Sequence, residues 1–316
     1  MGQSEKVIYV DRIDKSFGKK RVLAGISFTV QKGQVFALLG ENGAGKTTMI
    51  RILTTLLKPD GGQARVGGYD VVREPGQVRK QFSLTGQNAA VDPVLTGREN
   101  LMLIAGLRHL MQPRQVADQL LRRFSLIDAA DRPLAKYSGG MRRRLDIAMG
   151  LIGRPAILFL DEPTTGLDPR SRLGLWQVIR QLQKEGTTIF LTTQYLEEAD
   201  RLADTIAFLN QGRIVASGSP EALKKRVMHK QLLLTFATAD ALNTAATILE
   251  NDRPQVNETE LKLTIRSDGS VRQLVDVLNA LEQAFVPVKT FTQTEPSLDD
   301  VFMQLTKNDL QSEALH

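Results

Sequence analysis

Hydrophobic and polar positions divide the N-terminal part of the chain into short stretches of different period. Alternation predicts two strands, at residues 7–10 and 22–30, on either side of a polar turn. The apolar run at 34–39 predicts a buried strand. Apolar residues at helical spacing then predict a helix that begins at Lys46 and is stopped by Pro59. Strand, glycine-rich loop and helix therefore follow one another directly.

The middle of the chain, at about residues 95–152, has helical periodicity. Thr96 and Glu99 have the spacing of a capping box, Pro113 begins a second helix, and a third starts just after Gly140. Beyond this region, strands alternate with a helix, which favours a mainly parallel sheet with a helical insertion. The predicted elements are strands at 156–160, 187–192, 205–209 and 213–216 and a helix at 172–184.

A smaller unit is predicted at the C-terminus. A last helix of the first unit opens at Ser219-Pro220, and the basic stretch 224–230 is predicted to be a linker. We therefore expect a first domain at 1–225 and an accessory α+β domain at 226–316. The second domain is predicted to contain strands at 232–236, 261–265 and 286–291 and helices at 239–249, 271–283 and 297–305.

Composition narrows the class of protein. No apolar run approaches the roughly 20 residues that span a bilayer, and the first residues lack the apolar stretch of a secretory signal. Absence of cysteine and three scattered histidines argue against disulfides and metal clusters. The net charge is +6, but aromatic residues make up only 5%, so no base-stacking platform stands out. We expect an intracellular protein that does not bind nucleic acid.

A phosphate-binding loop is predicted at residues 40–47, whose sequence GENGAGKT matches the pattern GxxxxGKS/T. The glycines let backbone N–H groups approach phosphates closely, Lys46 adds a positive charge, and Thr47 offers a hydroxyl to Mg²⁺. A simple glycine-rich turn is disfavoured, because the loop lies between a buried strand and an amphipathic helix. The predicted contacts to ATP are Gly40, Asn42, Gly43, Ala44, Gly45, Lys46, Thr47 and Thr48.

Two acidic residues follow the apolar run 157–160. An aspartate at the end of a central strand, here Asp161, can hold Mg²⁺ through water. The adjacent Glu162 is placed to orient and polarise the attacking water. An acidic turn is the alternative interpretation, and the phosphate-binding loop earlier in the chain argues against it. The pair therefore predicts hydrolysis of ATP.

These motifs, together with YSGGM at 137–141, resemble the nucleotide-binding subunit of an ABC transporter over about residues 5–220. The sequences LTTQYLEEAD at 191–200 and EPSLDDVF at 295–302 are similar to ATP-binding subunits of bacterial drug exporters of the daunorubicin/doxorubicin-resistance type. The resemblance implies an α/β P-loop NTPase core with an antiparallel β lobe and a helical subdomain, followed by a small C-terminal α+β domain.

The resemblance also assigns a signature loop to Ser138, Gly139 and Gly140. In the family this loop caps the γ-phosphate of ATP that is held by a partner subunit. A hydroxyl and N–H groups at the start of a helix make a suitable anion site. Met141 stands where the family usually has glutamine. Backbone contacts to phosphate should survive that change, whereas a polar side-chain contact is lost.

Further roles are implied at single positions. Gln87 matches the glutamine that senses Mg²⁺ and the membrane partner, and Asp168 matches the loop that links the two sites of a dimer. Phe17 matches the aromatic residue that stacks on adenine, where tyrosine is commoner. A solvated strand end for Gln87 and a core aromatic for Phe17 are the alternatives from sequence.

Gln194 is the main departure, because most ABC ATPases have histidine there. The glutamine amide can donate a hydrogen bond to phosphate, but it does not titrate near neutral pH. Gln194 can therefore position groups and cannot act as a general acid or base. Since Glu162 is present, we expect hydrolysis to persist. The same glutamine occurs in the drug-exporter type, which favours a working variant.

Three arginines at 142–144 lie at the start of a predicted helix, where positive charge opposes the helix dipole. An acidic partner is therefore expected to compensate them. A solvated face is the first interpretation of the run. The sharper hypothesis is a contact to the partner subunit or to the membrane component.

The combined prediction is an ATP-hydrolysing subunit that drives export of drugs or other hydrophobic compounds through a separate integral membrane subunit. Lys46 and Glu162 would act in catalysis with Gln87 and Gln194, and Mg²⁺ would be held by Thr47, Gln87 and, through water, Asp161. Two chains would dimerise head to tail on the cytoplasmic face of the cell membrane. The sequence does not specify the transported substrate, homodimer or heterodimer, or the role of the C-terminal domain.

Two alternatives remain open. A nucleotide-binding regulatory module with vestigial hydrolysis is favoured by Gln194 and Met141 and disfavoured by the intact Glu162. An ABC ATPase without a membrane partner would act on ribosomes or DNA. Such proteins usually have two ATPase cores or a long coiled coil, and neither is present in this sequence.

Overall fold

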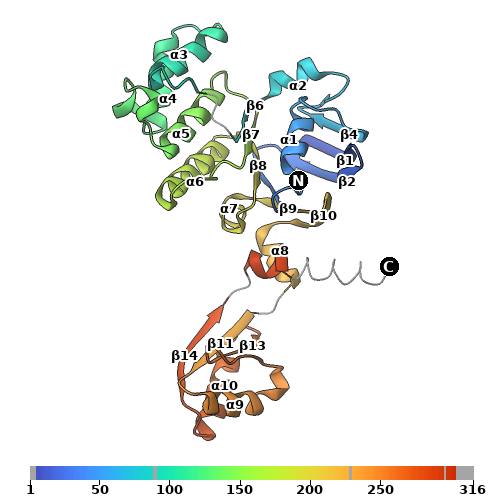
Figure 1. Cartoon of the computed structure of the whole chain (residues 1–316), viewed down its shortest axis with the longest axis vertical. Helices are drawn as coiled ribbons and strands as arrows, with labels where there is room; N and C mark the ends of the chain where they lie inside the picture. The colour runs from blue at the N-terminus through green and yellow to red at the C-terminus, as the bar shows by residue number, and fades with distance from the viewer. Residues whose placement is uncertain (1–4, 88–90, 228–229, 295–296, 304–316) are drawn as a thin grey trace. The chain divides into compact units, whose positions relative to one another are not determined.

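The computed structural model describes residues 5–87, 91–227, 230–294 and 297–303. The chain divides into two compact units, residues 1–220 and residues 221–316 (Figure 1). In the part of the chain that the structure describes, every helix is too short or too polar to cross a lipid bilayer. The sequence Glu295-Pro296, which contributed to the resemblance, lies outside the described residues.

An antiparallel sheet forms the first lobe of the N-terminal unit. Its strand order is β2-β1-β4-β5, and each neighbouring pair is antiparallel. Ile8 and Val10 of β1 alternate into the core, and Ile13 is also buried after an irregularity in the pairing between Val10 and Ile13. The antiparallel β lobe is thus confirmed. Its strands are β1 (Lys6–Phe17), β2 (Lys20–Gln31), β4 (Gly61–Val66) and β5 (Tyr69–Asp70).

A second sheet has six strands in the order β10-β9-β3-β8-β7-β6. All neighbouring pairs are parallel except the β9–β10 hairpin. Strands β3, β7 and β8 are buried along their whole length, which explains the apolar runs in β3 and β7. The strands are β3 (Val35–Leu39), β6 (Phe82–Thr85), β7 (Ile157–Asp161), β8 (Thr188–Thr193), β9 (Thr205–Asn210) and β10 (Arg213–Gly218).

The core of this unit lies between the two sheets. Phe28 of β2 stacks on Phe36 of β3 with ring centroids 4.9 Å apart, and Phe36 stacks on Phe190 of β8 at 5.3 Å. Helix α1 (Lys46–Leu53) also contributes its apolar side to this core. These contacts fix the end of β3 and the start of α1, between which the glycine-rich loop lies.

Helix α1 ends at Leu53 and is shorter than the apolar pattern predicts. Thr55 has a left-handed backbone with φ of 63°, and the N–H of Leu56 donates to the carbonyl of Arg51 at 2.8 Å. These contacts close the helix before Pro59. Leu56 continues the apolar spacing but is 66% exposed. The predicted extension of the helix was therefore wrong.

The helical region is present as predicted, and Figure 1 shows α3, α4 and α5 grouped together. The capping box is confirmed, because Thr96 Oγ1 accepts from the N–H of Glu99 at 3.2 Å and Glu99 Oε2 accepts from the N–H of Thr96 at 2.8 Å. Short 3₁₀ turns at Ile127–Ala129 and Leu134–Lys136 connect α4 to α5. The helices are α3 (Gly97–Leu107), α4 (Pro113–Arg123) and α5 (Gly139–Gly150).

Helix α6 (Pro169–Lys184) begins three residues earlier than predicted, with proline in its first turn. Two short helices were not predicted, α2 (Pro75–Gln81) and α7 (Leu196–Leu202). Each is only seven residues long, so each contains too few turns to give a clear apolar period. Helix α7 lies directly after the loop that contains Gln194.

The C-terminal unit contains a four-stranded antiparallel sheet in the order β12-β13-β11-β14. Its own apolar core includes Leu232, Leu234, Leu263 and Leu281. Residues 224–227 belong to a helix rather than to the predicted linker. The last two residues of the helix predicted at 297–305, residues 304 and 305, lie outside the described ranges. The elements are α8 (Pro220–Val227), β11 (Lys230–Phe236), α9 (Ala239–Ile248), a 3₁₀ turn (Glu250–Asp252), β12 (Gln255–Asn257), β13 (Lys262–Ser267), α10 (Val271–Gln283) and β14 (Val288–Thr294).

Candidate active site

The loop between β3 and α1 needs glycine at two positions for different reasons. A Cβ atom on Gly40 would lie 2.3 Å from the carbonyl oxygen of Leu209, so a side chain there cannot be accommodated without moving backbone. Gly45 is the N-cap of α1 and has φ of 112°, a conformation that side chains disfavour. The loop therefore wraps tightly at the N-terminus of α1, where N–H groups favour an anion.

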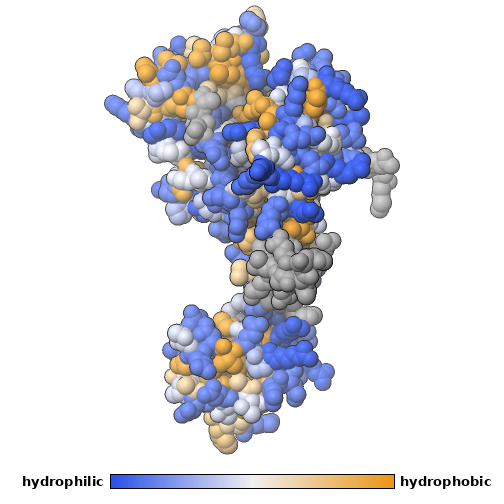
Figure 2. Space-filling model, turned by 45° about the vertical axis from the view of Figure 1, so that its right-hand side comes forward, coloured by the Kyte–Doolittle hydropathy of each residue, from blue (hydrophilic) through white to orange (hydrophobic). Residues whose placement is uncertain are grey.

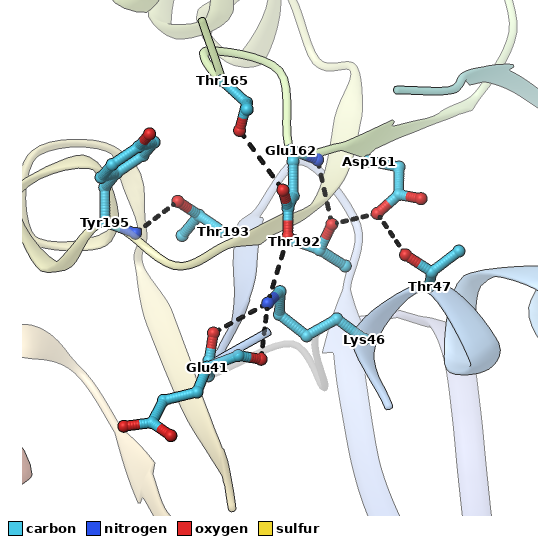
Figure 3. A network of polar contacts seen from close by, with 10 residues as sticks. Glu41, Lys46, Thr47, Asp161, Glu162, Thr165, Thr192, Thr193 and Tyr195 are labelled. Atoms are coloured by element: carbon cyan, nitrogen blue, oxygen red, sulfur yellow. Dashed lines mark hydrogen bonds and ion pairs between the residues drawn. The ribbon is translucent and has the colours of Figure 1, made fainter. Parts of the chain in front are cut away.

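Lys46 places its ammonium group at the centre of this loop (Figure 3). Nζ donates to the carbonyls of Gly40 at 2.8 Å and Glu41 at 2.9 Å, and it lies 3.1 Å from Oε1 of Glu162. The side chain is only 4% exposed, so its charge needs these oxygen partners. A phosphate group that enters the loop presents oxygens of the same kind to the same ammonium group.

Asp161 is the last residue of β7, and its carboxylate contacts the end of β8 and the start of α1. Its Oδ1 accepts from Thr192 Oγ1 at 2.6 Å and from Thr47 Oγ1 at 3.3 Å. Asp161 and Thr192 are paired neighbours in the parallel sheet, which fixes the carboxylate. Carboxylate and hydroxyl oxygens are the ligands that Mg²⁺ prefers, so the residues present fit this ion.

Glu162 follows β7 with a left-handed backbone, φ 47°, that is unusual for a residue with a side chain. Its N–H donates to both the carbonyl and Oγ1 of Thr192, each at 3.1 Å. Its Oε2 accepts from Thr165 Oγ1 at 3.3 Å, while Oε1 faces Lys46. The side chain is 8% exposed. A carboxylate at this place can accept a proton from a water molecule held against a phosphate.

A cavity of about 160 Å³ brings Gln87, Glu162 and the glycine-rich loop together. Gln87 comes from the segment after β6, so the structure unites three parts of the chain that are far apart in sequence. Val22 of β2 also lines this space, and the alternating pattern of β2 gave no signal for that role. The lining residues are Val22, Asn42, Gly43, Gly45, Lys46, Thr47, Thr48, Gln87 and Glu162.

Gln194 lies one residue beyond β8 and is half-buried. Because β8 is the neighbour of β7, Gln194 follows its strand at the same edge of the sheet as Glu162. Thr193 Oγ1 accepts from the N–H of Tyr195 at 3.0 Å and holds the turn around Gln194 (Figure 3). Its contact with phosphate stays a prediction.

Phe17 ends β1 and is 50% exposed, so it does not belong to the core. Lys15 Nζ lies 5.7 Å from the centre of its ring, within the range of a cation–π contact. Phe17 is not among the residues that line the cavity. Stacking on adenine therefore stays a prediction, and the exposed ring face is compatible with it.

Ser138 is the N-cap of α5, and its Oγ accepts from the N–H of Met141 at 3.3 Å. Ser138 and Gly139 are exposed, and neither they nor Gly140 line the cavity of their own chain. Asp168 caps α6 and accepts from the N–H of Ser171 at 2.9 Å. The hydrogen bond from the Ser171 side chain is the main cause that lowers the pKa of Asp168.

Arg143 corrects the interpretation of the arginine run as a solvated face. Its side chain is buried, whereas Arg142 is exposed. Its guanidinium reaches the carbonyls of Gly86, Asp161 and Pro163, and Nη1 lies 3.4 Å from Oδ2 of Asp146. Burial lowers the pKa of Arg143, and the nearby Asp146 and Asp161 carboxylates oppose that shift. Asp146 is the acidic partner that the run was expected to need.

Comparisons with known proteins identify the family. Residues 23–165 match the ABC transporter family, and residues 218–306 match the C-terminal domain of DrrA1-3-like ATP-binding proteins. The daunorubicin resistance ATP-binding protein DrrA2 of Streptomyces coeruleorubidus is 46% identical over 95% of this chain and 94% of that protein. The doxorubicin resistance ATP-binding protein DrrA of Mycobacterium tuberculosis is 41% identical over 99% of this chain and 97% of that protein.

A solved ATP-binding cassette of an ABC transporter, MJ1267 in its ADP conformation, is 25% identical. It superposes with a TM-score of 0.64 over 71% of this chain and 95% of that structure. Because it covers nearly the whole of that cassette, the match confirms the predicted fold class. The chain therefore belongs to the ABC transporter ATP-binding proteins, in the branch of the daunorubicin/doxorubicin resistance proteins, and is a nucleotide-binding ATPase of the kind that couples ATP hydrolysis to transport.

Proposed function

We propose that the chain hydrolyses ATP·Mg²⁺ to drive export of drugs or other hydrophobic compounds through a separate membrane subunit. The observation that carries this proposal is the group formed by Lys46, Asp161 and Glu162 at one end of the parallel sheet. Lys46 Nζ lies 3.1 Å from Glu162, and Glu162 and Gln87 line the same cavity. A phosphate-binding cation and a candidate base thus share one site.

Each residue has a distinct task in this proposal. Lys46 and the loop N–H groups bind the β- and γ-phosphates, and Glu162 accepts the proton of the attacking water. Gln194 donates a hydrogen bond that orients the γ-phosphate. When bound, Mg²⁺ neutralises charge on the phosphate oxygens. Thr47 and Gln87 would hold it directly, and Asp161 would hold it through water.

A second copy of the chain would complete the site. Ser138 and Gly139 are exposed at the N-terminus of α5 and lie outside the cavity of their own chain. In a head-to-tail pair, these groups would face the γ-phosphate bound by the partner, and Asp168 would lie near the contact between the two sites. ATP would close this pair, and hydrolysis would reopen it.

The helical region offers a surface for the membrane subunit. Four apolar side chains there are strongly exposed, namely Val94, Leu103, Leu107 and Met111. Figure 2 shows hydrophobic residues gathered at the upper end of the first unit. Apolar patches of this kind mark interaction sites. We place the protein on the cytoplasmic face of the membrane, bound to that subunit.

We assign residues 1–225 to the ATP-binding domain, with the helical subdomain at about 95–152, and residues 226–316 to an accessory domain. The division of the chain into two compact units after Pro220 supports this assignment. The match of residues 218–306 to a C-terminal domain of its own also supports it. The drug class is proposed from relatives whose names refer to daunorubicin and doxorubicin resistance.

The proposal is tested by ATP-dependent transport. Inside-out membrane vesicles that contain the chain and its membrane subunit are expected to accumulate doxorubicin when ATP and Mg²⁺ are supplied. Chelation of Mg²⁺ by EDTA should stop both phosphate release and accumulation, because the oxygen ligands at Thr47 and Asp161 would be left without their ion. Release of phosphate without accumulation of any hydrophobic compound would overturn drug export and leave the ATPase assignment intact.

Gln194→Ala is expected to lower kcat about tenfold, because one hydrogen bond to the transition-state phosphate is lost. The pH–rate profile should keep its shape, since an amide does not titrate near neutral pH. Steady-state phosphate release from pH 6 to 9 measures both quantities. Gln77→Ala on α2 is the matched control and should leave kcat unchanged. An unaltered kcat in Gln194→Ala would exclude the proposed contact.

A further inference from the structure

Three segments meet at the buried guanidinium of Arg143. Nε donates to the carbonyl of Pro163 at 2.9 Å, and Nη2 donates to the carbonyl of Asp161 at 3.1 Å. Nη1 donates to the carbonyl of Gly86 and contacts Asp146 of its own helix at 3.4 Å. The planar fork of arginine is suited to several acceptors in fixed directions, which an ammonium group cannot match. Arg143 therefore ties α5 to two loops of the site.

The acceptors flank the residues that the proposed function requires. Asp161 and Pro163 stand directly before and after Glu162, and Gly86 directly precedes Gln87. Arg143 thus holds the backbone on both sides of the candidate base. It also holds the backbone that carries the candidate Mg²⁺ ligand. Glu162 and Gln87 are otherwise on separate loops, after β7 and β6.

Glu162 needs such support because of its backbone. A left-handed conformation is unfavourable for a residue with a Cβ, and it persists only when surrounding contacts impose it. On one side, Thr192 accepts the N–H of Glu162 twice, at 3.1 Å. On the other side, Arg143 binds the two flanking carbonyls. Without the guanidinium, the peptide groups around Glu162 lose half of these restraints.

We propose that Arg143 is a positioning residue that transmits the position of α5 to Glu162 and Gln87. Helix α5 begins at Gly139, next to the exposed Ser138, and Arg143 lies in its second turn. A short helix moves as a rigid element, so a contact made at Ser138 by the partner's nucleotide reaches the carbonyls around Glu162. The inference rests on the proposed roles of Glu162, Gln87 and Ser138, and it adds a physical link between them.

The test compares variants of the full chain. Arg143→Met removes all four contacts, and Arg143→Lys keeps the charge without the fork. Arg144→Met is the matched control, because Arg144 lies on the same helix and donates to the carbonyl of Phe124 at 2.9 Å, away from the site. A double variant, Arg143→Met with Asp146→Leu, replaces both members of the buried ion pair by apolar groups, which buried pairs often tolerate. It provides a folded protein if Arg143→Met alone is unstable.

The expected result is a loss of kcat without a loss of ATP binding. Arg143→Met and the double variant should lower kcat about 100-fold, the effect of a small displacement of a catalytic group, while the Kd for ATP changes less than about threefold. Arg143→Lys should recover part of kcat, and Arg144→Met should keep the wild-type value. In the Glu162→Gln background, Arg143→Met should lower the residual rate no further.

Three results would overturn the inference. The first is a wild-type kcat in folded Arg143→Met. The second is a parallel loss of kcat and ATP affinity in every Arg143 variant. The third is full additivity of the effects of Arg143→Met and Glu162→Gln on kcat. Turnover at the wild-type rate in Glu162→Gln itself would instead overturn the proposed role of Glu162. The two failures are therefore distinguishable in one set of assays.

Discussion

Glu162→Gln is expected to lower the rate of phosphate release about 10³-fold, within the range for loss of a general base. The amide has almost the same shape as the carboxylate but cannot accept the proton of the attacking water. The Thr192 and Arg143 contacts involve the backbone around residue 162, so they should survive the substitution. Steady-state release at saturating ATP measures the effect on kcat.

The same substitution is expected to tighten ATP binding about tenfold, a change of about 1.4 kcal/mol. In the structure, Oε1 of Glu162 lies 3.1 Å from Nζ of Lys46. Phosphate oxygens must therefore compete with that carboxylate for the ammonium group. Glutamine removes this competition and the repulsion between carboxylate and γ-phosphate. Equilibrium titration with ATP checks the affinity. Glu41→Gln is the control, because only the carbonyl of Glu41 contacts Lys46. Unchanged or weaker binding by Glu162→Gln would contradict the competition.

Local patterns predicted the parts of the site that lie in continuous segments. The loop at 40–47 and the apolar run before Asp161 each carry their chemistry within a few residues, and the capping box at Thr96 is equally local. The parallel sheet then places their ends together, because successive strands end at one edge. The antiparallel lobe and the C-terminal unit were recognised chiefly from the resemblance and from the strand–helix alternation.

Features that depend on tertiary contacts escaped sequence reasoning. Arg142 and Arg143 are adjacent residues of the same type, so the sequence does not distinguish them. Arg143 is the buried one, because α5 packs with this side chain against the carbonyls of Gly86, Asp161 and Pro163. A signal was present, since Asp146 stands at i+3 among apolar residues and suggests a buried pair. The contribution of Val22 to the cavity has no comparable signal. The early end of α1 was hidden because Leu56 continues the apolar spacing while remaining exposed.

Ser138→Arg is expected to abolish turnover, with kcat lowered at least about 100-fold, while ATP binding remains. Ser138 is exposed and lies outside the cavity of its own chain, so arginine there leaves the Lys46 loop intact. The long side chain blocks the N-terminus of α5, where the γ-phosphate of the partner would bind. ATP titration and phosphate release on the same sample separate binding from turnover. Gln115→Arg, at an exposed position of α4, is the control for an added surface charge.

Mixing two inactive chains distinguishes a shared site from a site within one chain. Lys46→Ala lacks the ammonium group proposed to bind phosphate but keeps the proposed signature loop at Ser138, whereas Ser138→Arg keeps the ammonium group and blocks that loop. In a head-to-tail pair that contains one chain of each kind, one of the two sites combines an intact Lys46 with an intact Ser138. Purified through two different affinity tags, this pair should recover about half of the wild-type rate, because a two-fold pair has two equivalent sites. A site that is complete within one chain would leave the mixed pair inactive, and a Ser138→Arg chain that is active alone would exclude Ser138 from the site. Recovery would therefore show that each chain lends α5 to the other's ATP, which is the coupling that Arg143 is placed to receive.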